Sequence, residues 1–218
     1  LTALDVSTNT ALTVLGCSDN QLTALDVTAN MALEYLYCSG NQLTSLDVSS
    51  NTILAGLNCT NNQLTSLDVS ANTVLDWLTC DQNLLTSLDV SINTALFYLK
   101  CGNNQLTSLD VSANTALEWL VCDENLLSSL DVSTITALTV LQCNNNQLTD
   151  LNIKNTNNSN IDVDFSSFIE NPDLTCIQVD NKAYSDTNWA SIKDAIATYC
   201  EDCASLSNEN MVLAKVSI

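Results

Sequence analysis

The stretch ALTVLGCSDNQLTALDVTANM, residues 11–31, decides the fold. Units of the same length and pattern follow it without insertion or deletion, beginning at Ala32, Ile53, Val74, Ala95, Ala116 and Ala137. A strict period of about 20–50 residues indicates a solenoid, in which each coil buries its apolar side chains against its neighbours. The period therefore predicts a long, thin core that is stabilised mainly between adjacent coils.

The apolar spacing inside the unit identifies the kind of solenoid. Leu12, Leu15, Cys17, Asn20 and Leu22 follow the pattern L-x-x-L-x-L-x-x-N-x-L, with cysteine in place of the third leucine. The second half of the unit repeats the phrase, so each coil is a nested pair of about 10 and 11 residues. This resembles the bacterial 21-residue leucine-rich repeat class over residues 1–157, which implies a leucine-rich repeat solenoid.

Alternating side chains in both halves of the unit predict strands. In Leu15-x-Cys17 and Leu25-x-Val27, every second side chain points inward. We therefore expect short parallel β-strands on both faces of each coil, in two sheets packed back to back, with a small helical cap at the C-terminal end.

The period fails after Asn157. We expect residues 158–203 to form a degenerate last coil and a disulfide-bearing helical cap, and residues 204–218 to be a linker or the start of a sorting domain. In the cap, Trp189, Ile192 and Ile196 have helical spacing, which predicts a helix from Ser185 to Tyr199 with Ser185 or Asp186 as N-cap. Trp189 is then a core residue of the cap.

The ten cysteines fall into two groups. Seven form one inward column, and we expect them to act as small buried hydrophobes: Cys17, Cys38, Cys59, Cys80, Cys101, Cys122 and Cys143. Cys176, Cys200 and Cys203 lie outside the column. A Cys176–Cys200 bridge would join the helix to the last coil, whereas Cys200–Cys203 is the competing pairing. Either bridge implies an oxidising, extracellular setting.

Two asparagine columns mark the corners of the coils. One runs unbroken from Asn20 to Asn146, and the other runs from Asn9 to Asn114 and breaks at Ile135. Buried amides have to be hydrogen-bonded, so both columns are expected to be structural.

The C-terminal region carries a second resemblance. Residues 208–218 resemble the lead-in to the sorting domain of Bacteroidetes proteins exported by the type IX secretion system, and so do residues 175–180 followed by Asn188, Trp189 and Cys200. The resemblance implies a secreted or surface-anchored protein. The chain begins at Leu1 within a repeat, so we interpret it as a fragment of a mature protein.

Charge limits the partners. The net charge of −20 repels nucleic acid and anionic membranes, so neither is an expected partner. The sequence contains no run of 18 apolar residues, so direct membrane insertion is not expected. A protein or a glycan is the expected ligand.

The outward residues of the first half vary between coils, whereas Leu-Thr-Ser-Leu-Asp-Val-Ser recurs in the second half. A face fitted to an irregular ligand cannot repeat, so we place the candidate binding site on the variable face: Tyr35, Tyr37, Asn58, Trp77, Asp81, Phe97, Tyr98, Lys100, Glu118, Trp119 and Asp123. The alternative is that these aromatic side chains only stabilise the sheet.

The repeated face carries an aspartate column whose weak metal candidates are Asp26, Asp47, Asp68, Asp89 and Asp110. Ca²⁺ could bridge such carboxylates, although no Ca²⁺-loop motif is present. The alternative function is therefore a structural or adhesive surface rod whose aspartate ladder binds cations. No other cofactor is expected.

An enzyme is not expected. The chain has no histidine, nucleophile elbow or P-loop. Asp81 and Asp123 lie two coils apart, about 10 Å, which is slightly farther than the two carboxylates of an inverting glycoside hydrolase.

Overall fold

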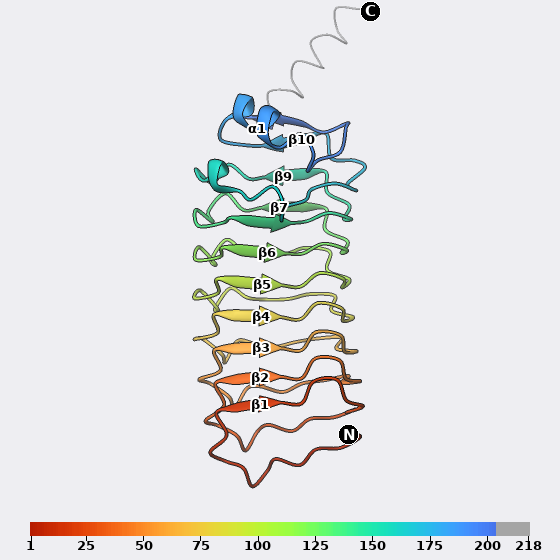
Figure 1. Ribbon diagram of the computed structural model, residues 1–218, viewed down its shortest axis with the longest axis vertical. Coiled ribbons are helices and arrows are strands. Elements are labelled where there is room, and N and C mark those ends of the chain that lie inside the picture. Colours follow the sequence, from red (N-terminus) through yellow and green to blue (C-terminus); the bar gives the residue numbers. More distant parts are fainter. Residues whose placement is uncertain (204–218) are drawn as a thin grey trace, which may run out of the picture.

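The computed structural model describes residues 1–203, which form a stack of coils along the long axis of the molecule (Figure 1). Within these residues the first halves of the coils build a seven-stranded parallel sheet. Its strands are β1 (Val14–Gly16), β2 (Tyr35–Tyr37), β3 (Gly56–Asn58), β4 (Trp77–Thr79), β5 (Tyr98–Lys100), β6 (Trp119–Val121) and β8 (Val140–Gln142). Equivalent residues pair, as in Leu36 with Leu57, so the sequence columns are columns in space.

The second halves form a sheet only near the C-terminal end. Its order is β11-β10-β9-β7, with β7 (Ser129–Asp131), β9 (Asp150–Asn152), β10 (Cys176–Gln178) and β11 (Thr198–Cys200). The predicted parallel strands on both faces are confirmed, but before residue 129 the second halves have no strand in the described chain. In those coils each aspartate accepts a hydrogen bond from the amide two residues later, as Asp68 does from Ser70 at 2.9 Å.

The core lies between the two faces. Leucine and valine columns fill it, and the seven column cysteines are free thiols buried among them, as the spacing predicted. Burial raises the pKa of the Cys59 and Cys101 thiols to about 12. These thiols are therefore neutral and apolar at physiological pH.

The two asparagine columns hold the turns of successive coils together, but they are not equivalent. Asn83 accepts the Leu64 amide at 3.0 Å and donates to the Cys59 and Cys80 carbonyls at 3.0 and 3.1 Å. Asn72 donates to the carbonyls of Val48 and Asn51 at 3.1 and 2.8 Å. Its Oδ1 is buried and accepts no hydrogen bond from residues 1–203. The structural role predicted for both columns is confirmed.

The cap helix differs from the prediction. Helix α1 is Lys182–Asn188, after a short 3-10 helix at Asn158–Asn160, so the predicted span Ser185 to Tyr199 is wrong. Asn181, not Ser185 or Asp186, is the N-cap: its side chain accepts the Tyr184 amide at 3.0 Å. Tyr199 instead lies in β11 and pairs with Ile177. Of the residues whose spacing suggested a helix, Ile196 is 59% exposed.

Trp189 closes the core as predicted. It is fully buried, and its ring makes edge contacts with Phe168 at 6.2 Å and Tyr199 at 5.7 Å. The Tyr199 hydroxyl donates to the Trp189 carbonyl at 2.9 Å. The region resembling a sorting domain, residues 208–218, lies outside the described residues. None of the helices in residues 1–203 is long and apolar enough to span a bilayer.

Candidate ligand-binding face

Aromatic rings form a continuous row on the outer surface of the seven-stranded sheet. Trp77, Tyr98 and Trp119 are paired in register on β4, β5 and β6. Their ring centroids lie 6.3 Å apart between Trp77 and Tyr98, and 5.7 Å apart between Tyr98 and Trp119, whose planes are stacked at 22°. Tyr37 extends the row at one end, 6.0 Å from Trp77, and Phe165 at the other, 5.8 Å from Trp119. We call these five residues the aromatic strip.

The sequence did not predict Phe165, because it lies in the irregular segment after the repeats. The Gln142 side chain donates to the Phe165 carbonyl at 2.8 Å, and a bridge joins Gln142 to Ser167. These contacts hold the segment beside β8 and bring the ring against Trp119. Phe165 is 52% exposed, so it widens the apolar surface.

Gly56 makes room for the rings that lie on either side of it. A Cβ atom at Gly56 would lie 2.7 Å from Cδ1 of Tyr35 and 3.3 Å from Cε3 of Trp77. The two rings therefore rest over a buried backbone position. The missing side chain lets Trp77 approach Tyr37 across the coil between them. A single glycine in a column of bulky residues was the sequence signal for this gap.

One predicted site residue is neutralised. Asp81 is buried, and its carboxylate pairs with Lys100 Nζ at 3.2 Å and accepts from Thr60 Oγ1 at 2.6 Å. Asn58 uses its Oδ1 to accept the Thr60 amide at 3.1 Å. These polar groups already have partners within the sheet.

Asp123 has a different environment. Burial raises the pKa of its carboxyl group, its own backbone N–H and nearby Lys100 lower it, and Glu124 raises it further. The carboxylate lies over Gly102, where a Cβ atom would be 2.3 Å from Asp123 Oδ1. Gly102 therefore gives Asp123 its position at the edge of the strip.

The opposite edge of the strip carries the predicted residue Glu118 and two further acidic residues. Glu34 and Glu118 are exposed and Asp76 is partly exposed, each directly before a strand. Phe97 occupies the same column and is 43% exposed. The predicted residues thus lie on one face, with carboxylates along both edges of the aromatic surface.

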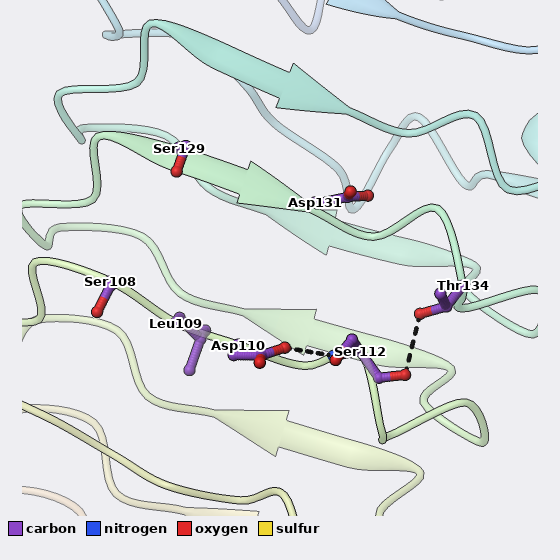
Figure 2. Close-up of a pocket in the computed structure, with 7 residues that line it drawn as sticks. All are labelled: Ser108, Leu109, Asp110, Ser112, Ser129, Asp131 and Thr134. Atoms are coloured by element: carbon purple, nitrogen blue, oxygen red, sulfur yellow. Dashed lines mark hydrogen bonds between the residues drawn. The ribbon is translucent and has the colours of Figure 1, made fainter.

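The aspartate column lies on the second-half face. Shallow pockets separate its coils, and one is lined by Ser108, Leu109, Asp110, Ser112, Ser129, Asp131 and Thr134 (Figure 2). Figure 2 shows the Asp110 carboxylate turned along its own coil to accept the Ser112 amide, not toward Asp131. Hydrogen bonds from the Ser70 hydroxyl and amide likewise lower the pKa of Asp68.

Three cysteines converge where the last two strands end. Cys176 Sγ lies within bonding distance of both Cys200 and Cys203 Sγ, and Cys200 Sγ is 2.8 Å from Cys203 Sγ. Because a sulfur forms only one disulfide, the two bonds are alternatives. The expected Cys176–Cys200 bridge is one alternative, a Cys176–Cys203 bridge is the other, and the competing Cys200–Cys203 bond is not formed.

Solved structures share this architecture. An internalin (inlF) from Listeria monocytogenes is 25% identical, with a TM-score of 0.68, over 75% of this chain and 49% of that chain. YopM, a leucine-rich effector protein from Yersinia pestis, is 25% identical, with a TM-score of 0.59, over 78% of this chain and 45% of that chain. The chain has the leucine-rich repeat fold. The fold and the 21-residue repeat predicted from the sequence are thereby confirmed.

A further leucine-rich repeat structure is the functional domain of InlJ from Listeria monocytogenes, whose description includes a cysteine ladder. It is 34% identical over 81% of this chain and 50% of that chain, with a TM-score of 0.49. The chain thus spans about half the length of these structures. No protein-family model and no curated protein matches the sequence.

Proposed function

We propose that this protein is a non-catalytic binding module that holds a protein or polysaccharide ligand on the aromatic strip. The observation that carries the proposal is the unbroken row of five rings on the face whose residues vary from coil to coil. Leucine-rich repeat solenoids present extended surfaces of this kind to ligands. Tryptophan and tyrosine side chains are also enriched among the residues that dominate binding energies.

The absence of histidine from the sequence and the neutralised Asp81 both favour binding over catalysis. We further propose that the protein is secreted or held at the cell surface, with export by the type IX system, on the resemblance of its C-terminal region. The disulfide supports an oxidising location.

Ligand capture with strip variants tests the proposal. The wild-type protein and Trp119→Ala would be applied to a glycan array and to surface extracts of the producing cells, with Ile92→Ala as a control. Ile92 is 53% exposed and lies beside the aspartate column, away from the strip. The proposal requires a ligand that Ile92→Ala retains and Trp119→Ala loses, while circular dichroism shows both folded. Equal losses of binding and stability in Trp119→Ala would support a packing role.

The aspartate column favours a second function, a structural or adhesive rod that gathers cations. Its carboxylates recur on each coil and form no ion pair within residues 1–203. Ca²⁺ or Mg²⁺ at constant ionic strength should then raise the unfolding temperature. An unchanged temperature would exclude this function.

A further inference from the structure

Negative charge borders the aromatic strip on both edges and has little compensation. Among residues 1–203, Glu34, Asp76, Glu118 and Asp123 form no ion pair. Lys100 is the only basic side chain between residues 1 and 150, and it is already paired with Asp81. The fold therefore leaves the acidic edges for a group that comes from outside.

Two of these carboxylates are next to the tryptophans in sequence. Asp76 precedes Trp77 and Glu118 precedes Trp119, so each indole has a carboxylate at the start of its own strand. An aromatic face attracts a guanidinium or ammonium group, and a nearby carboxylate can pair with the same cation. A neutral glycan would use the rings and leave the carboxylates unpaired, and an anionic glycan would be repelled.

We propose that the ligand of the aromatic strip is a basic polypeptide segment whose arginine or lysine side chains lie on Trp77, Tyr98 and Trp119. The charges of this segment pair with Asp76, Glu118 and Asp123. The inference rests on the proposed function, because it names the ligand class of the same site. Lys100 does not oppose the approach, since Asp81 neutralises it.

The spacing of the rings fits an extended chain. Successive ring centroids are 5.7 to 6.3 Å apart. Alternate side chains of an extended peptide lie on one side, about 6.8 Å apart. A segment that runs along the solenoid axis can therefore place a cation over each ring when every second residue is basic.

The probe is a synthetic peptide of alternating arginine and serine with four arginines, titrated into the wild-type protein and followed by tryptophan fluorescence and calorimetry. A peptide with citrulline in place of arginine keeps the shape and removes the charge. We expect the arginine peptide to bind one protein molecule and the citrulline peptide to bind at least about tenfold more weakly. Binding should weaken as salt screens the charges.

Matched variants separate the strip from the general acidity of the chain. The pair Asp76→Asn with Glu118→Gln removes two charges beside the strip, and Asp68→Asn with Asp89→Asn removes two from the aspartate column. The first pair should lower the affinity for the arginine peptide about fivefold and the second less than twofold. Trp119→Ala should lower it about tenfold. Equal effects of the two pairs would overturn the inference, because binding would then follow net charge alone.

A neutral oligosaccharide of six glucose units tests the other ligand class. If it binds in a Trp119-dependent way and the arginine peptide does not, the inference fails and the proposed function stands. If neither probe binds, the inference fails, and the proposed function is decided by capture of the native ligand.

Discussion

The two asparagine columns predict unequal costs for the same substitution. Asn83 and Asn72 are both buried at turns, and both join successive coils. Asn83 receives one hydrogen bond and donates several, whereas Asn72 only donates and leaves its Oδ1 without a partner in the described chain. Replacing Asn83 by alanine should therefore destabilise the fold more than replacing Asn72.

The magnitude follows from the groups left unpaired. Asn83→Ala leaves the buried Leu64 amide without its acceptor, whereas the Cys59 and Cys80 carbonyls keep the side-chain amides of Asn62 and Asn104 as donors. At about 1–3 kcal/mol for an unsatisfied buried group, we expect a loss of about 2–3 kcal/mol. Asn72→Ala leaves neither carbonyl unpaired, because the Asn51 and Leu54 amides still donate to the Val48 and Asn51 carbonyls, and it removes an acceptor that was already unsatisfied, so we expect about 1 kcal/mol.

Ile135 supports this ranking. It takes the place of asparagine in the column of Asn72, is fully buried, and its carbonyl accepts Asn155 Nδ2 at 3.0 Å. The carbonyls of Val111 and Asn114, which an asparagine at this position would serve, keep the amides of Asn114 and Leu117 as donors, so the column of Asn72 accommodates an apolar residue.

Urea denaturation followed by circular dichroism measures both variants. Parallel thermal scans test for cooperativity, because a solenoid can unfold in parts. The reasoning is refuted if Asn72→Ala costs as much as Asn83→Ala in two cooperative transitions. That outcome would mean that the Asn72 amide is fully satisfied in solution.

Three further predictions concern the strip, the disulfide and the thiol column. Gly56→Ala should displace the rings beside it, change the near-ultraviolet circular dichroism and lower the free energy of unfolding by about 1–3 kcal/mol. The control Gly16→Ala should be nearly neutral, because no atom lies within 4 Å of its new Cβ. Similar spectra for both variants would count against the packing of the strip. Cys176→Ser should lose the disulfide between β10 and the following segment and about 2–4 kcal/mol of the free energy of unfolding, while Cys203→Ser keeps a disulfide. Non-reducing peptide mapping of the wild type should find Cys176 in every disulfide. A Cys200–Cys203 disulfide would contradict this prediction. Burial raises the pKa of the Cys59 thiol in the folded state to about 12, above its value in the unfolded state. The folded state therefore keeps the thiol proton to higher pH, and the free energy of unfolding should fall as pH rises from about 9 toward 12. Urea denaturation at a series of pH values measures this, and a constant free energy of unfolding over that window would contradict a buried thiol column.

The sequence predicted the solenoid because each inward position recurs in seven coils, so errors at one position cannot change the period. The cap occurs once and had no such averaging. Trp189, Ile192 and Ile196 fit a helical period, but Asn181 caps the helix earlier and Tyr199 pairs as a strand. Tertiary contacts decided that segment, and single-sequence periodicity does not contain them.

The candidate site, like the fold, could be predicted from the sequence only in part. The in-register repeats predict that Trp77, Tyr98 and Trp119 lie in one column, and the pairing of β4, β5 and β6 confirms it. The contact of Phe165 and the pairing of Asp81 with Lys100 could not be predicted, because both depend on side-chain positions and on an irregular segment. Together they add one ring to the predicted aromatic row and remove Asp81 from the carboxylates that are left for a ligand.

The structure also gives a physical reason why one half of each coil varies and the other does not. Backbone hydrogen bonds between coils hold the first halves, so the outward side chains there are free to differ. Before residue 129 the second halves have no strand among the described residues and depend on side chains, with each aspartate accepting the amide two residues later. Their sequence has to repeat because it holds the backbone, which makes the aspartate column structural in the first place. Variation on the first face is then permitted by the sheet, and the clustering of aromatic rings and unpaired carboxylates on it is what points to a ligand.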